Sequence, residues 1–502
     1  MSPQPYGGSR VSLRRVLDQV ELVGAEDVLF CHCEIDPAKV RPGDLFVALA
    51  SSGADPYLGA YHAAANGAGA VLADTFLPEL GVPVAIVPDT GEACAQLAHA
   101  LAGFPSRVLP VVGLVGGRCA RLGAAFLQTV LAPVDPHRGV AAPEAAFASP
   151  EAMQFLWGTD PRLPAWWLRA MADSGVRISV LPIPEKAVSA GKLAGFHFFG
   201  LALGPVRRGF RRRLGRQSVG RWLRLVDQID PAGWAVVARD NPFFECMLQV
   251  LEVPGVTVDV EGPAEVSAQV VEESLRGQLV LLRVDDEVHV VRLRLPGREA
   301  LYGALLATAL ALGCGIDLLE IPKRLSHLSA VPGYLQPLDV GGAWSALVDE
   351  FSSFDDLEQT LATVRRLSRG AVHCVLPSLR ALEAGGDLDC SIGVRLRLIK
   401  LLRWADALYL RTDWKDVWDV LGGAAAFRGH SGTEIGRLRE RIVVCEGVEA
   451  ALTEAVRACR PGDTVLVSLP VGDDQIAPGP NGARQIGDFL SRLNGSRLSQ
   501  AA

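Results

Sequence analysis

The chain has 502 residues, which is too long for one hydrophobic core of typical size and predicts two to four domains. Apolar residues make up 49% and charged residues 21%, a balance that excludes a disordered chain. The formal net charge of −7 argues against a general nucleic-acid binder, so no nucleic acid is expected among the partners.

The N-terminal fifteen residues lack the apolar core of a signal peptide. The longest apolar stretch, residues 193–206, is too short to span a bilayer and is interpreted as a buried strand, so we expect a cytoplasmic protein without a transmembrane segment. Cys31-His32-Cys33 lacks the spacing of a zinc knuckle. Metal binding there is one interpretation, and buried free thiols in a reducing compartment are the favoured one.

Strands and helices are expected to alternate from the start of the chain. In residues 1–108 the expected strands are 44–49, 70–73 and 84–87, and the expected helices are 60–69 and 93–102. Such alternation predicts a parallel sheet that is covered by helices on both faces.

A glycine cluster follows, in residues 111–126, which read VVGLVGGRCARLGAAF. An apolar strand, a glycine loop and a small-residue helix in this order are typical of a nucleotide-binding P-loop. The Lys-Ser/Thr pair that should end such a loop is absent, and Ala120 and Arg121 are assigned to its place. The candidate degenerate nucleotide loop therefore consists of Gly113, Gly116, Gly117, Arg118, Ala120 and Arg121.

The rest of the chain repeats the α/β pattern. A long apolar helix is expected at 300–312 and a turn at 330–333, and strands are expected at 176–181, 201–203, 234–238, 256–260, 278–282, 344–348, 371–376, 407–410 and 464–468. We therefore predict an α/β protein with parallel or mixed sheets flanked by helices, divided into domains 1–108, 109–332 and 333–502.

Several phrases in collinear order resemble the Mur ligases, most closely the MurE-like type. Residues 36–49 (DPAKVRPGDLFVAL) resemble the family's D-S-R-x-V-x-P-G-D-L-F-V-A-L, and residues 331–334 (VPGY) resemble its V-P-G-R. Residues 458–466 (ACRPGDTVL) are similar to A-R-P-G-D-V-V-L. The resemblance implies three domains: an N-terminal domain for the UDP-substrate, a P-loop-like central domain and a Rossmann-like C-terminal domain.

The resemblance also implies a reaction. Family members use ATP and magnesium to add an amino acid to a UDP-MurNAc-peptide in peptidoglycan precursor synthesis, with an acyl phosphate as intermediate. Glu144 and Glu185 are the candidate metal ligands, since they lie in the segments that resemble T-T-P-E and E-V-S-S-H. Candidate substrate or nucleotide residues that remain from the family's motifs are Asp36, Asp349, Asp355 and Asp413.

Many of the family's chemical groups are replaced in this chain. Its phosphate-binding lysine corresponds to Ala120, and its metal-binding hydroxyl corresponds to Arg121. The D-N-P-R segment, which grips diaminopimelate in the family, reads DWKD at 413–416, so an acid replaces the bidentate arginine. Turn and core residues are kept, which predicts that the chain retains the family's fold. The replaced groups make binding of ATP and magnesium doubtful.

Eight arginines lie within residues 207–224. One interpretation is an anion site for a phosphate, a lipid surface or an acidic protein, and the favoured one is a solvated basic surface. The candidate anion patch comprises Arg207, Arg208, Arg211, Arg212, Arg213 and Arg216.

Two hypotheses follow for the function. The first is a MurE-like homologue that has lost catalysis and acts as a binding or scaffold protein, with UDP-MurNAc-peptide or another protein as its partner. The second is an active, diverged ATP-dependent acid–amino-acid ligase that uses Arg118, Arg121 or another arginine as its phosphate cation.

Overall fold

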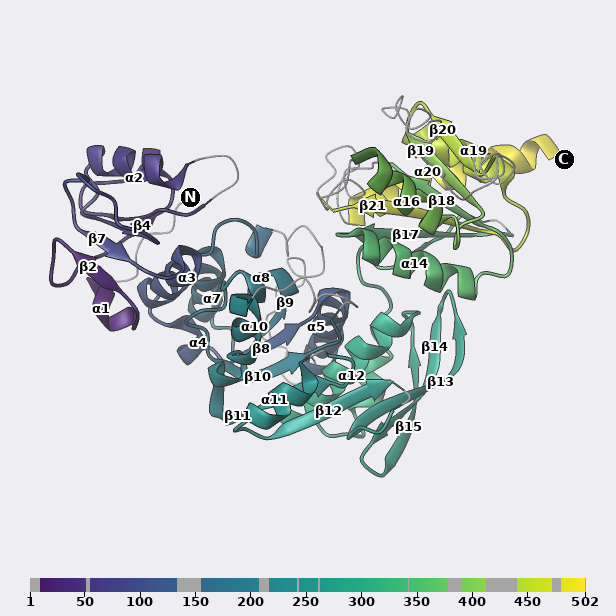
Figure 1. Cartoon of the computed structure of the whole chain (residues 1–502). Coiled ribbons are helices and arrows are strands. Elements are labelled where there is room, and N and C mark those ends of the chain that lie inside the picture. The colour runs from purple at the N-terminus through teal and green to yellow at the C-terminus, as the bar shows by residue number, and fades with distance from the viewer. Residues whose placement is uncertain are drawn as a thin grey trace.

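The chain forms three α/β units in chain order, each built around its own sheet (Figure 1). The computed structural model describes residues 10–50, 55–132, 155–206, 216–241, 243–260, 262–341, 343–377, 390–411, 440–471 and 480–501. The three sheets lie within residues 21–86, 111–293 and 336–470. The predicted α/β class with mixed sheets and flanking helices is thus confirmed, whereas the domain limits at 108 and 332 stay predictions.

The N-terminal unit has a five-stranded sheet in the order β2-β7-β6-β5-β4. These strands are β2 (Glu21–Val23), β4 (Cys33–Glu34), β5 (Leu45–Val47), β6 (Ala70–Ala73) and β7 (Val84–Ile86), and only β2 runs antiparallel to its neighbour. Helix α2 (Pro56–Ala65) covers one face and α3 (Thr90–Leu101) covers the other, because the strand residues are apolar on both sides. A short pair, β1 (Val11–Ser12) and β3 (Leu29–Phe30), adjoins α1 (Leu13–Val16).

The central unit has an eight-stranded sheet in the order β15-β14-β13-β12-β11-β10-β8-β9. The strands β8 (Val111–Val115), β9 (Ser179–Ile183), β10 (Phe198–Leu203), β11 (Ile229–Ala238), β12 (Gly255–Val260) and β13 (Val266–Ser274) are parallel. Two antiparallel strands, β14 (Gly277–Val284) and β15 (Glu287–Leu293), extend the sheet at one end.

Helices pack on both faces of the central sheet. Helix α5 (Gly117–Leu131) and α12 (Arg298–Gly313) lie on one face with α13 (Ile321–Leu325). Helices α7 (Leu163–Asp173), α8 (Glu185–Ser189), α10 (Arg216–Leu223) and α11 (Phe244–Val250) lie on the other. The short α4 (Pro105–Val108) connects this unit to α3.

The C-terminal unit has a six-stranded sheet in the order β16-β17-β21-β18-β19-β20, in which only β16 (Gln336–Leu338) is antiparallel. The parallel strands are β17 (Ser345–Phe351), β18 (Val372–Leu376), β19 (Ala407–Arg411), β20 (Ile442–Cys445) and β21 (Thr464–Pro470). Its helices are α14 (Phe354–Leu367), α16 (Cys390–Leu401), α19 (Val448–Ala458) and α20 (Pro480–Ala501).

Some expected boundaries differ from the observed ones. The apolar stretch 193–206 contains a strand only at Phe198–Leu203, and the strand expected at 176–181 runs from Ser179 to Ile183. Helix α3 begins at Thr90 because the Asp89 carboxylate caps it by accepting from the Glu92 amide. Strands β13 and β15 were not predicted, since exposed charges interrupt the apolar pattern along them.

Helices α5 and α12 approach so closely that glycine is required on both. A Cβ on Gly303 would lie 2.9 Å from the backbone nitrogen of Gly123. We expect Gly303→Ala to lower the free energy of unfolding by about 1–3 kcal/mol, although alanine favours helices, because the two backbones must separate. In the matched control Gly487→Ala on α20, the new Cβ makes an ordinary 3.6 Å contact, and no loss is expected in urea unfolding. Equal stability of both variants would contradict the close-packing argument.

Candidate functional site

The carboxyl ends of β10, β8 and β9 meet at Gly116, the residue between β8 and α5. Its amide donates to the carbonyl of Ile183 at 3.2 Å, and the amide of Gly204 donates to the carbonyl of Val115 at 2.8 Å. Gly116 has φ +130°, and a Cβ there would lie 3.3 Å from the carbonyl oxygen of Pro205. The carboxyl edge of a parallel sheet is where α/β proteins bind ligands, so this edge is the candidate site.

The turn from strand to helix is one residue long. Strand β8 ends at Val115 and α5 begins at Gly117. In a P-loop the lysine lies at the start of the helix, and here Gly117 and Arg118 begin α5. Ala120, which is predicted to correspond to the lysine, lies one turn into α5, is fully buried and donates its amide to the Gly116 carbonyl.

A carboxylate of the chain itself lies at the N-terminus of α5. Glu185, at the start of α8 directly beyond β9, accepts through Oε1 from the Gly117 amide at 3.2 Å, and only 7% of the residue is exposed. Helix N-termini attract anions because their amide groups are unsatisfied and the helix dipole is positive there. Glu185 thus lies where a phosphate oxygen would accept in a P-loop.

The metal role expected of Glu185 stays a prediction. Within the described ranges, no group of three or more His, Cys, Asp and Glu side chains is arranged to hold a metal ion. The second candidate ligand, Glu144, lies outside the described residues. The contact of Glu185 with the Gly117 amide is one that a helix-capping carboxylate makes.

Arg118 points away from the loop and into the contact between the central and C-terminal units. Its guanidinium forms an ion pair with Asp349 on β17, donates to Thr360 on α14 and lies 3.5 Å from Glu299. Arg118 is 8% exposed and Asp349 is fully buried. Burial opposes the charge, but Asp349 and Glu299 outweigh it and raise the pKa of Arg118 above its ordinary value.

Asp349, a predicted substrate or nucleotide residue, forms its hydrogen bonds and its ion pair with other residues of the chain. Besides Arg118, its carboxylate accepts from the Thr360 hydroxyl at 2.8 Å and from the Leu335 amide at 3.0 Å. The Tyr334 ring packs over the Arg118 guanidinium at 4.8 Å. The sequence placed Arg118 and Asp349 in separate motifs, and the structure brings them together.

Arg121 also serves the connection between the units. It donates to the carbonyl of Pro332 at 2.7 Å and to that of Gly333 at 3.4 Å, in the segment that leads into β16. Burial lowers the pKa of Arg121, and the charge of Arg118 acts in the same direction. Both loop arginines are therefore directed toward the C-terminal unit.

A second polar group lies at the ends of β11 and β12. The Tyr302 hydroxyl lies 2.7 Å from Asp240 Oδ2 and 3.1 Å from Asp259 Oδ1, and Arg298 pairs with Asp240 at 3.0 Å. The side-chain amide of Asn241 donates to the Gly204 carbonyl at 2.8 Å. This group was not predicted from the sequence, although polar residues directly after the apolar strand at 234–238 were a usable signal.

Asp36, the candidate residue of the N-terminal unit, caps a short helical turn, η2 (Pro37–Lys39). It accepts from the Ala38 amide at 3.0 Å and lies 2.9 Å from Lys39 Nζ. The hydrogen bond from Lys39, followed by the one from Ala38, lowers the pKa of Asp36. The carboxylate thus has a local structural role.

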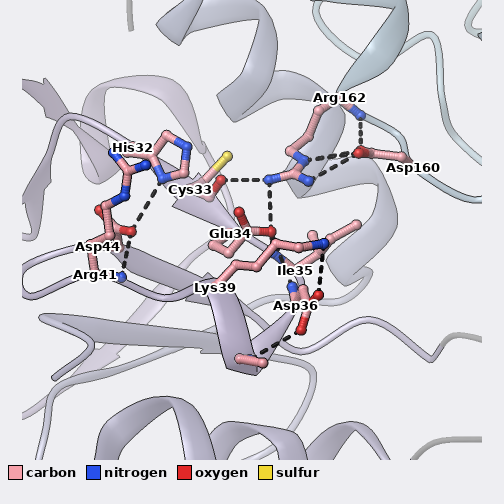
Figure 2. A network of polar contacts seen from close by, with 11 residues as sticks. His32, Cys33, Glu34, Ile35, Asp36, Lys39, Arg41, Asp44, Asp160 and Arg162 are labelled. Carbon is pink, nitrogen blue, oxygen red and sulfur yellow. Dashed lines mark hydrogen bonds and ion pairs between the residues drawn. The ribbon is translucent and has the colours of Figure 1, made fainter. Parts of the chain in front are cut away.

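Next to Asp36, the buried Arg162 connects the N-terminal and central units (Figure 2). It donates to the Cys33 carbonyl at 2.7 Å, pairs with Glu34 at 3.2 Å and is held by Asp160 on its own unit. Arg162 therefore ties strand β4 to the start of α7. Sequence patterns gave no sign of this contact.

The other predicted residues are placed only in part. Asp355 is half-buried in the first turn of α14. Asp413 and the arginines of the candidate anion patch from Arg207 to Arg213 lie outside the described residues, and of Arg216 only the backbone is described. Beyond the patch, Arg221 pairs with Glu92 at 2.9 Å and with Asp89 at 2.6 Å and so forms a contact between units, whereas 60% of the Arg224 side chain is exposed.

Three features of the described residues at this helix N-terminus bear on a magnesium-bound triphosphate. The first amide of α5 carries a carboxylate, no lysine opens the helix, and the nearest two arginines are directed toward the C-terminal unit. Among the described residues, no helix is long and apolar enough to cross a membrane.

Comparisons with known proteins point to one group of enzymes. No protein-family model matches this sequence. The UDP-N-acetylmuramoyl-L-alanyl-D-glutamate–2,6-diaminopimelate ligase of Streptomyces avermitilis is 27% identical over 492 residues, covering 93% of this chain and 92% of that protein. The enzyme of the same name from Geobacillus thermodenitrificans is 24% identical over 475 residues, covering 88% and 91%.

Solved structures show the same fold. A UDP-N-acetylmuramoyl-L-alanyl-D-glutamate–2,6-diaminopimelate ligase superposes with a TM-score of 0.60 at 17% identity, covering 96% of this chain and 99% of that one. The MurF ligase of Thermotoga maritima in complex with ADP superposes with a TM-score of 0.57 at 14% identity, covering 93% and 98%.

Proposed function

We propose that this chain, a homologue of the MurE-type Mur ligases along almost its whole length, is a binding protein of peptidoglycan precursor synthesis that no longer performs ATP-dependent ligation. The observation that carries the proposal is the Glu185 carboxylate on the Gly117 amide. An ATP phosphate at this helix N-terminus meets an anion already in place, and like charges at contact distance disfavour its binding.

The directions of Arg118 and Arg121 support the same proposal. Phosphoryl transfer depends mostly on positioning and on neutralising charge around the phosphates. For Arg118 to serve as a phosphate cation, it must leave Asp349, which would then remain buried and unpaired. The alternative hypothesis, an active ligase with a substitute arginine, therefore carries a large structural cost.

The retained features suit binding. The N-terminal unit keeps its sheet and both covering helices, and Arg162 fixes it to the central unit. The relatives' names specify a UDP-N-acetylmuramoyl-dipeptide as substrate, so this compound or a protein of the same route is the expected ligand. Binding without turnover needs neither a magnesium-bound triphosphate nor a metal ligand at Glu185.

Titration calorimetry tests the loss of ATP binding. We expect no heat with ATP and magnesium, whereas the Streptomyces avermitilis relative, measured in parallel, serves as the positive control. We also expect no phosphate release with UDP-MurNAc-L-Ala-D-Glu and any amino acid. Micromolar ATP binding, or amino-acid-dependent phosphate release, would establish the diverged ligase instead.

A variant makes the role of Glu185 specific. Glu185→Ala removes the carboxylate from the Gly117 amide, and we expect it to gain measurable affinity for ADP or inorganic phosphate. The matched control is Glu320→Ala, which removes a partly exposed carboxylate paired with Lys323 and should gain none. If Glu185→Ala binds as little phosphate as the unmodified chain, the carboxylate is not what excludes the nucleotide.

A further inference from the structure

Strand β15 is the free edge of the central sheet. It pairs with β14 on one side, and no described strand pairs with it on the other. Strands β14 and β15 form the antiparallel extension beyond β13, at one end of the central unit (Figure 1). An unpaired edge presents a row of backbone donors and acceptors that another strand can satisfy.

The outward face of this edge carries two exposed valines, with the exposed Arg283 and Arg292 beside them. Val288 is 49% exposed and Val290 is 67% exposed, and both lie on the face opposite to Val291 and Leu293, which are buried in the core. Across the ladder, Val290 lies opposite the half-buried Leu281 of β14. Proteins usually protect edges with inward charges, proline or a covering segment, and two exposed valines at one edge do the opposite.

The charges along the strand are arranged asymmetrically. Asp285, Asp286 and Glu287 precede the valines. Arg292 lies near the end of β15 and Arg294 directly follows the strand, and all five charged residues are exposed. An antiparallel neighbour with the same sequence brings its basic end against this acidic start. A second copy of the chain thus offers complementary charges as well as complementary backbone hydrogen-bonding groups. A two-fold axis between two copies makes their β15 strands antiparallel.

We propose that two copies of this chain associate through antiparallel pairing of their β15 strands, which joins the two central sheets into one. A two-fold axis normal to the sheet leaves every side chain on the same face of the joined sheet. Two residues that lie opposite each other must therefore both have even numbers or both have odd numbers, because side chains alternate between the faces. Pairing centred on His289 opposes Val288 with Val290 of the second copy, and Asp286 with its Arg292. This association goes beyond the proposed binding function and does not depend on it.

Sedimentation velocity over a concentration series tests the association. The full chain is expected to show a monomer–dimer equilibrium, and Val290→Lys is expected to raise the dimer dissociation constant about tenfold, because both Val–Val pairs are lost by symmetry. The matched control is Val271→Lys on β13, which is 53% exposed and separated from the edge by β14, and it should dimerise like the unmodified chain. A monomer at every concentration overturns the proposal, as does a dimer that Val290→Lys leaves unchanged.

A charge exchange tests the register. Asp286→Arg alone and Arg292→Asp alone should each weaken the dimer, since each creates two like-charge contacts across the axis. The double variant should recover most of the lost affinity, while Asp285, which has a left-handed φ of +48°, stays unchanged. Failure of the double variant to recover affinity overturns the pairing centred on His289.

Discussion

Arg118→Ala is expected to lower the free energy of unfolding by about 3–5 kcal/mol, because it leaves the Asp349 carboxylate buried without its charged partner. Thr360 and the Leu335 amide remain as donors to Asp349, but neither carries a charge. Urea unfolding followed by tryptophan fluorescence and circular dichroism measures the loss. Since Arg118 lies on α5 and Asp349 on β17, the loss is also expected to weaken the contact between the central and C-terminal units.

Two further variants test whether the loss of stability comes from the buried Arg118–Asp349 ion pair. Arg457→Ala removes an arginine whose side chain is 71% exposed and pairs with Glu454, and its effect should stay within about 0.5 kcal/mol. Asp349→Asn combined with Arg118→Ala should cost less than the sum of the two single changes, because the unpaired charge is removed. A loss below about 1 kcal/mol for Arg118→Ala would contradict a buried ion pair between the units.

Acid is expected to destabilise the fold through His99, a residue that our sequence analysis did not single out. It is fully buried on α3, and its Nε2 lies 2.7 Å from the Ser106 hydroxyl. Burial, followed by the nearby charges of His197 and Arg107, lowers the pKa of His99 from 6.5 to about 3. The unfolded chain therefore binds a proton between about pH 6.5 and 3 that the folded chain does not.

The sign of the effect follows from this difference. The stability that neutral His99 contributes is present above pH 6.5 and falls by about 1.4 kcal/mol for each pH unit below it, until the pH reaches about 3. In unfolding experiments across this range, His99→Gln should show a shallower dependence on pH, whatever its stability at neutral pH. His62→Gln, at an exposed position, should keep the slope of the unmodified chain. Identical slopes for all three proteins would show that His99 takes up its proton while folded.

The proposed loss of catalysis and the proposed dimer concern different parts of the central unit. The carboxylate-capped helix lies at the carboxyl ends of β8 and β9, whereas β15 is the edge strand at the opposite end of the sheet order from β9. The nucleotide measurements and the sedimentation measurements therefore fail or succeed independently. A chain that binds no ATP and yet dimerises would suit a scaffold.

The sequence by itself determined the three α/β units and the position of the glycine turn after β8. Apolar runs between turn residues are local patterns that involve positions only a few residues apart, so they can be recognised from the sequence. The strand–glycine–helix order at Gly116 and the turn at 330–333 are local in the same way. The absence of a lysine from the loop was equally clear. The assignment of Ala120 to the lysine's place stays a prediction, because the length of the turn depends on where β8 and α5 meet.

Only the tertiary structure decided what the charged residues of the loop do. Glu185 meets Gly117 across 68 positions of sequence, Arg121 meets Pro332 across 211, and Arg118 meets Asp349 across 231. Neither spacing nor propensity carries information over such separations, and an arginine near a glycine loop suits a phosphate as well as a buried aspartate. The packing of the C-terminal unit against α5 decides which partner Arg118 binds, because it places the buried Asp349 carboxylate beside the guanidinium.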